Sequence, residues 1–187
     1  MNIELLTETQ VLRKEYIKTF LMTWEQFQIE HKEFITNLKE KHNTIVDEKF
    51  YDDSLMWDKM PTKYPYIPFD DAINLLKSID GDVLFMAEDK TFHNGYLFYN
   101  NEKIANFIAK SNANELAELI EYEWYESYRL AEQDMHYDDF VLPDDLYVFD
   151  KSMKWTIVFT HETEDWESEI DNPMKAAQSR ICIAQGF

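Results

Sequence analysis

Two histidine-containing stretches hold the residue types that most readily do chemistry. Residues 136–139 read His-Tyr-Asp-Asp, and His161 is followed directly by Glu162. Imidazole and carboxylate groups together can bind a divalent metal ion or exchange protons with a substrate. If His136, His161 and Glu162 met in one cleft, a metal-assisted hydrolase would be one interpretation. The alternative is an edge-of-core histidine bonded to the backbone, because 37 acidic residues make chance proximity common.

Other catalytic patterns are missing from the sequence. Only three glycines occur, which excludes a phosphate-binding loop and a dinucleotide fingerprint. No Gly-x-Ser-x-Gly nucleophile motif is present, and the single cysteine, Cys182, excludes a zinc knuckle. We therefore expect no cofactor, and the absence of an enzyme motif favours a non-catalytic protein.

The charge of the chain is strongly negative and unevenly placed. The formal net charge is −19, and residues 111–150 carry twelve Asp and Glu against one basic residue, Arg129. Direct binding to a nucleic-acid backbone or to an anionic membrane needs clustered Lys and Arg, so both are disfavoured. A basic protein partner is the remaining interpretation, with simple solubility as the alternative.

Residues 112–134 predict a helix with two different faces. Asn112 and Glu115 form a potential capping box, and apolar residues recur at helical spacing from Leu116 to Ala131. Carboxylates and tyrosines occupy the opposite side, and tyrosine is enriched at protein interfaces. We therefore predict a partner-binding surface here, extended by acidic residues farther along the chain. Its predicted members are Glu115, Glu118, Tyr122, Tyr125, Glu126, Asp138 and Asp139. The alternative is a solvated helix face.

The stretch 145–162 predicts the central β-hairpin. Two runs rich in β-branched and aromatic residues, 146–149 and 155–160, flank a polar loop that Asp150 can begin. Both faces of the second run are apolar, which indicates a central strand covered on each side. Cys182 and the flanking residues 180–184 predict a last strand, with Cys182 in the core.

The remaining segments predict a single α+β domain with a mainly antiparallel sheet of about five short strands. Residues 1–42 form an N-terminal helical segment, with one long helix or two abutting ones over 8–41. An aromatic loop spans 43–68, and it is a secondary candidate for a binding surface. The mixed body of 69–187 begins with a short helix over 68–78, followed by strands over 83–87 and 96–99 and a helix over 102–110.

Compartment and class follow from the same composition. A lone cysteine fits a reducing cytosol, the first residues lack a secretory signal, and no apolar run approaches the roughly 20 residues that cross a bilayer. We expect a cytoplasmic protein without membrane contact.

The sequence of the predicted hairpin resembles that of one group of bacterial proteins. The runs Asp-Leu-Tyr-Val-Phe-Asp at 145–150 and Trp-Thr-Ile-Val-Phe-Thr-His-Glu at 155–162 resemble the C-terminal hairpin of uncharacterised families of small acidic bacterial proteins, some of them immunity-protein-like. The match covers about a tenth of the chain and implies no catalytic residue. It implies a bacterial cytosolic protein of unsettled function, with inhibitor-type binding as one interpretation. Together with the negative charge, that interpretation predicts an immunity-type protein that neutralises a basic, toxin-like partner. The alternatives are the metal-assisted hydrolase and a structural or regulatory domain.

Overall fold

The computed structural model describes residues 2–88, 95–131, 141–163 and 180–187, with only the backbone described for 127–131. Its centre is a seven-stranded sheet in which every pair of neighbours is antiparallel, in the order β1-β6-β3-β7-β8-β9-β2. The strands are β1 (Glu4–Leu5), β2 (Tyr66–Pro68), β3 (Asp82–Ala87), β6 (Ile108–Asn112), β7 (Leu146–Phe149), β8 (Thr156–Thr163) and β9 (Arg180–Gln185). The predicted α+β class with a mainly antiparallel sheet is confirmed.

The predicted hairpin β7–β8 lies inside the sheet and is covered on both faces. Alternate residues contribute to two different clusters, Val148 and Ile157 to one and Tyr147 and Val158 to the other. Asp150 begins the connecting loop, where its carboxylate accepts the N–H groups of Ser152, Lys154 and Trp155. The alternation of two apolar sets therefore identified a central strand correctly.

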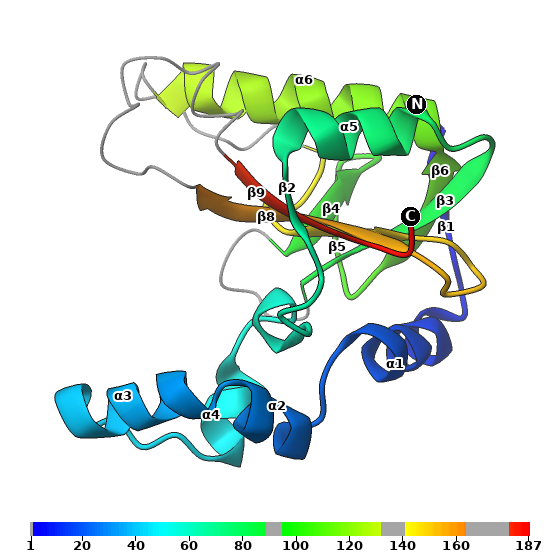
Figure 1. Ribbon diagram of the computed structural model, residues 1–187. Coiled ribbons are helices and arrows are strands. Elements are labelled where there is room, and N and C mark those ends of the chain that lie inside the picture. The colour runs from blue at the N-terminus through cyan, green and yellow to red at the C-terminus, as the bar shows by residue number, and fades with distance from the viewer. Residues whose placement is uncertain (1, 89–94, 132–140, 164–179) are drawn as a thin grey trace.

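Helices form one layer on each face of the sheet (Figure 1). Helices α5 (Phe69–Lys77) and α6 (Ala113–Ala131) cover one face, and their inner residues join the larger core cluster. Helix α1 (Thr9–Phe20) covers the other face, where Tyr16 is fully buried and its hydroxyl bonds to Thr156 Oγ1 at 2.8 Å. The sheet is thus the middle layer of three.

The prediction of one long helix or two abutting helices over 8–41 is wrong, because three helices occupy that range. After α1 ends at Phe20, the chain turns, and α2 (Trp24–Glu30) and α3 (Lys32–His42) follow. Thr23 starts α2 with a complete capping box to Gln26. This N-cap interrupts the helical pattern of apolar residues without any glycine or proline. The periodicity of the apolar residues alone did not reveal the interruption.

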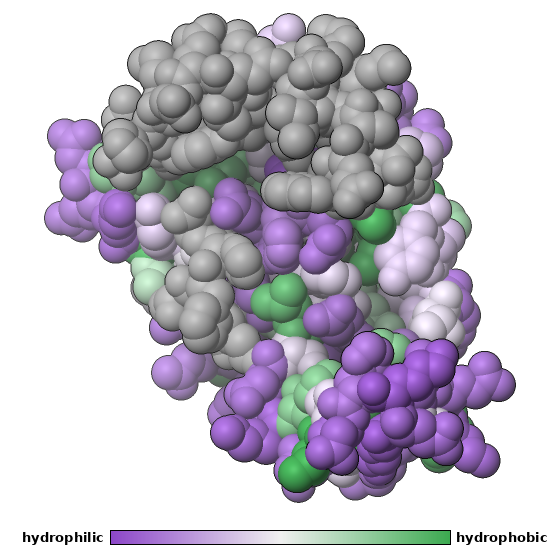
Figure 2. All heavy atoms as spheres, turned by 90° about the vertical axis from the view of Figure 1, so that its left-hand side faces the viewer, coloured by the Kyte–Doolittle hydropathy of each residue, from purple (hydrophilic) through white to green (hydrophobic). Residues whose placement is uncertain are grey.

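Residues 22–53 form a helical arm that lies to one side of the sheet (Figure 1). The segment predicted as an aromatic loop, 43–68, is not a loop throughout. Its first part holds helix α4 (Glu48–Asp53), which belongs to the arm. Its second part holds the 3-10 turn η1 (Trp57–Lys59) and strand β2, which lie outside the arm. The arm has a small core of its own, and hydrophilic side chains predominate on the face of the arm that Figure 2 shows. That core contains Met22, Phe27, Ile35 and Val46.

The predicted helix over 102–110 is also wrong. The chain forms strand β5 (Glu102–Ala105), which pairs with β4 (Tyr96–Tyr99) in a separate two-stranded sheet, and then enters β6. Asn106 adopts a left-handed backbone with φ of 52°, which ends β5 and redirects the chain. The described residues therefore hold nine strands instead of about five.

Candidate functional site

Helix α6 carries the predicted binding surface on its solvent side. Asn112 Oδ1 accepts the N–H of Asn114 at 3.0 Å and that of Glu115 at 3.4 Å, which starts the helix where the sequence predicted. The inner face buries Leu116 and Ile120 completely and Trp124 almost completely. This apolar face holds the opposite side of the helix toward water.

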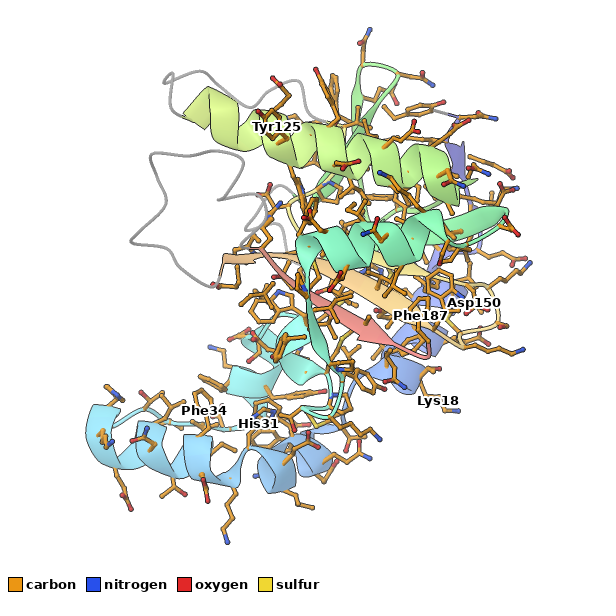
Figure 3. The ribbon with its side chains drawn as sticks, turned by 45° about the horizontal axis from the view of Figure 1, so that its top comes forward. Lys18, His31, Phe34, Tyr125, Asp150 and Phe187 are labelled. Carbon is orange, nitrogen blue, oxygen red and sulfur yellow. The ribbon has the colours of Figure 1, made fainter. Side chains whose placement is uncertain are left out.

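The outward side chains form what we call the acidic–tyrosine face, defined by Glu115, Glu118, Tyr122, Tyr125 and Glu126. Tyr122 is 63% exposed and Tyr125 is 36% exposed, which is high for aromatic side chains. Tyr125 is labelled on α6 in Figure 3. The Glu115 carboxylate accepts the backbone N–H of Asn2 at 3.0 Å. The face therefore offers phenolic rings between carboxylates on one continuous helix side.

The remaining predicted members of the surface, Asp138 and Asp139, lie outside the described residues, as does His136. The neighbouring Glu123 points inward instead, and its carboxylate accepts the N–H groups of Val141 and Leu142 at 2.7 and 2.8 Å. Burial raises the pKa of Glu123 to about 7, against these two hydrogen bonds. Glu123 thus anchors the chain where it returns after residue 140.

A second group of polar residues lies at the end of the sheet, where β7 begins and β8 ends. Asp145 is 1% exposed, and its carboxylate contacts the backbone N–H of His161 at 2.8 Å and the ring Nδ1 at 2.9 Å. Because an ionised carboxylate can only accept, Nδ1 donates in this pair. His161 is therefore bonded to a carboxylate through its ring, rather than only to the backbone as the simpler sequence interpretation held.

A β-bulge between Phe159 and Thr163 turns His161 away from its expected neighbours. Its ring meets Trp57 edge-on, with centroids 6.2 Å apart, and Trp57 packs with the cluster on the α1 side of the sheet. Phe159 belongs to the opposite cluster. The predicted alternation, which placed His161 beside Phe159, is broken by the bulge.

Glu88 and Tyr147 extend this group beneath the η1 turn. The Tyr147 hydroxyl donates to Glu88 Oε2 at 2.6 Å and accepts the N–H of Trp57 at 3.1 Å. The same Glu88 oxygen accepts the N–H of Met56 at 2.8 Å. We call Asp58, Glu88, Asp145, Tyr147 and His161 the sheet-end cluster.

The electrostatics of the sheet-end cluster favour bound protons. The hydrogen bond to Asp145 raises the pKa of His161, with the charges of Asp145 and Glu162 acting in the same direction. Burial raises the pKa of Asp58, and the same two carboxylates add to the effect. A raised pKa leaves less of the unprotonated imidazole at a given pH, and general base catalysis needs that form.

A metal site is not formed by the described residues. His161 Nε2 lies 3.6 Å from Glu162 Oε1, but within the described ranges no three His, Cys, Asp or Glu side chains are placed to hold a metal ion. The third predicted candidate ligand, His136, falls in a gap of those ranges. The metal-assisted hydrolase therefore stays a prediction, because one of its three candidate residues lies outside the described ranges.

Sequence reasoning found His161 but missed most of its neighbours. Asp58, Glu88 and Trp57 lie 57 to 104 positions away in sequence from Asp145 and His161, with no shared pattern. Only Asp145 carried a local signal, an acid directly before an apolar strand. Long-range pairing brought the others together.

Comparison with known proteins yields no relative: no family model, no curated protein and no solved structure matches this chain. Among the helices in the described part of the chain, none is both long and apolar enough to cross a bilayer.

Proposed function

We propose that this protein is a non-enzymatic binding protein that contacts a positively charged protein through its acidic–tyrosine face. The observation that carries the proposal is the exposure of Tyr122 and Tyr125 between carboxylates on the solvent side of α6. Large aromatic side chains held in water by a buried helix face are typical of surfaces that become covered.

The charge of this face selects the class of partner. Residues 111–150 hold more than half of the net charge of −19, so they attract cationic surfaces and repel phosphate groups. Carboxylates at the rim of an interface mainly accelerate association, while buried rings slow dissociation. The two residue types on the face supply both contributions.

The resemblance of the β7–β8 hairpin to immunity-like bacterial proteins supports a finer version. The partner would then be a basic, toxin-like protein whose own charged site is blocked by α6, and the protein would act in the cytoplasm of a bacterium. A protein that neutralises an enzyme by coverage needs no catalytic group.

The test uses three baits in parallel: the unmodified protein, Glu118→Lys/Glu126→Lys on α6, and Glu15→Lys/Glu40→Lys on α1 and α3 as a control with the same charge change. Each is used for a low-salt pull-down from the native cell with elution by a salt step. The captured protein is then purified, and its association rate with each bait is measured over a salt series.

The α6 variant is expected to lower the association rate constant at least about tenfold at low salt and to flatten its salt dependence. The control variant should change the rate by less than about threefold. Equal association rates for the α6 variant and the unmodified protein would overturn the proposal, as would a partner that is itself acidic.

A further inference from the structure

Helix α6 presents its outward side chains at a regular spacing. Glu115, Glu118, Tyr122 and Tyr125 follow one another at intervals of three, four and three residues, and all four are exposed. Two helices that pack along a shared seam meet through residues at this spacing. We propose that the acidic–tyrosine face is occupied by a single α-helix of the partner, which lies antiparallel along α6. This inference rests on the proposed function and specifies which element of the partner makes the contact.

The burial pattern of α6 marks these four positions as one continuous stripe. The residues on the opposite side of the helix are buried, namely Ala113, Leu116, Ala117, Ile120, Glu123 and Trp124. Helices α5 and α6 lie side by side on one face of the sheet (Figure 1), so the stripe points away from the sheet. From Glu115 to Tyr125 it extends over about 15 Å, at 1.5 Å per residue. This is the length of two heptads less one turn, enough for a short helix to follow.

Contacts within the protein set the limits of the stripe. On the side toward α5, Glu121 Oε2 forms an ion pair with Lys77 Nζ at 2.7 Å. Near the start of α6, the Glu115 carboxylate accepts the N–H of Asn2 at 3.0 Å. A partner element that fits between these limits runs along the axis of α6 instead of across it.

The backbone of α6 offers nothing to an added strand. Recognition by strand addition needs the unpaired N–H and C=O groups of a sheet edge, whereas those groups bond within the helix over Ala113–Ala131. The contact must therefore be made by side chains. Ridges of side chains three and four residues apart fit the grooves of another helix, which then crosses at about 20°.

The order of residues along the stripe specifies the chemistry of the partner helix. The first two positions are carboxylates and the last two are phenolic rings. Lys or Arg side chains therefore face Glu115 and Glu118, and apolar side chains cover Tyr122 and Tyr125. Antiparallel packing places opposite ends of the two helix dipoles side by side. It also places the partner's basic residues in its last turns, where they stabilise its own dipole.

Two synthetic peptides of identical composition and charge test the inference. Each is alanine-rich and about 21 residues long, because isolated helices shorter than about 12–15 residues are marginal in water. In the seam peptide, two leucines and then two lysines follow at the three-four-three spacing. In the scrambled peptide, the same four residues point in different directions around the helix. Fluorescence anisotropy at low salt should show that the seam peptide binds at least about tenfold more tightly.

Single replacements in the protein locate the contact. Tyr122→Ala should weaken binding of the seam peptide by about fivefold or more, because a covered ring is lost. Glu118→Gln should weaken it by about threefold at low salt and by less when salt is added. Tyr66→Ala on β2 is the matched control, since Tyr66 is 64% exposed and Tyr122 is 63% exposed. This control should change the affinity by less than about twofold.

Three results would overturn the inference: equal affinities of the seam and scrambled peptides, no binding of the seam peptide, or unchanged binding of the seam peptide by Tyr122→Ala. Each of them leaves the proposed function standing, because a cationic partner can contact the same face through another kind of element. The proposed function fails on a separate measurement, the association rate of the captured partner with Glu118→Lys/Glu126→Lys.

Discussion

The Asp145 carboxylate holds His161 at two points, its backbone N–H at 2.8 Å and its ring Nδ1 at 2.9 Å. Asp145 precedes β7 and His161 lies near the end of β8, so the pair closes the hairpin at the end opposite its loop. A carboxylate only 1% exposed needs such donors, because an unpaired buried charge is costly.

Replacing Asp145 with Asn is expected to lower the free energy of unfolding by about 2–4 kcal/mol, because a charge-assisted pair becomes a neutral contact. The pKa of His161 should fall in the same variant, since its largest raising influence is removed. Urea denaturation measures the first effect and an NMR titration of the imidazole measures the second. Unchanged titration of His161 would contradict the assignment of Asp145 as its partner.

Stability should decrease as the pH rises from about 4.5 through 7. Burial raises the pKa of Glu123 to about 7, so the folded state binds its proton more tightly than the unfolded state does. A raised pKa contributes stability that is complete below the unfolded value and is lost as the pH passes the folded value, here about 3 kcal/mol. His161 extends the loss above pH 6.5.

Glu123→Gln tests this origin, because Gln cannot ionise and still offers an oxygen to Val141 or Leu142. Denaturant unfolding across pH 4.5–8 should give a flatter profile than the unmodified protein. A variant profile with the original slope would assign the pH dependence to other groups.

Tyr147→Phe should cost more stability than Tyr16→Phe. The Tyr147 hydroxyl donates to Glu88 and accepts the Trp57 N–H, so its removal takes one of two donors from the buried Glu88 oxygen and the acceptor from the Trp57 N–H, at about 2–4 kcal/mol. Tyr16 bonds to Thr156, whose hydroxyl also reaches the carbonyl of Val148, so about 1 kcal/mol is expected there. Parallel urea titrations measure the free energy of unfolding of both variants. Equal losses of stability would show that the hydrogen bonds of the Tyr147 hydroxyl to Glu88 and Trp57 contribute little.

Gly186→Ala should displace the C-terminal residues, whereas Gly81→Ala should not disturb its surroundings. Both glycines have a left-handed φ, +94° and +95°, but a Cβ at Gly186 would lie 2.2 Å from the Lys154 carbonyl oxygen, and one at Gly81 meets no atom within 4 Å. Phe187, labelled in Figure 3, would leave the Trp155 ring, whose centroid is 5.3 Å away.

The NOE between the Trp155 and Phe187 rings should disappear in Gly186→Ala and persist in Gly81→Ala. The Gly81 variant should lose about 1 kcal/mol from backbone strain alone. Persistence of the ring contact in both proteins would mean that the C-terminal residues accommodate the added methyl group.

Local patterns were reliable where one strong signal governed a short segment. The alternating faces of β8 and the apolar stripe of α6 each required burial on particular sides. Asn112 and Asp150 each satisfy backbone groups two to five residues away, so their roles were readable from neighbouring residues. The exposed position of Tyr122 followed from the same stripe.

The errors arose where short signals competed. Residues 102–110 have spacing compatible with a helix, yet β3 and β4 offered them strand partners, and Asn106 turned the chain between the two pairings. Thr23 and Gln26 ended one helical pattern and began another. Such choices depend on distant partners and on single caps, which average periodicity does not resolve.

By itself, the sequence determined the α+β class, the central hairpin and the acidic outer side of α6, because hydrophobic periodicity and charge act over neighbouring residues. Only the tertiary structure decided that Asp58, Glu88 and Tyr147 gather around His161 at one end of the sheet. These residues come from separate segments, and their proximity results from strand order and from a bulge in β8. Their protonation depends on burial and on charges distant in sequence, which no local pattern contains.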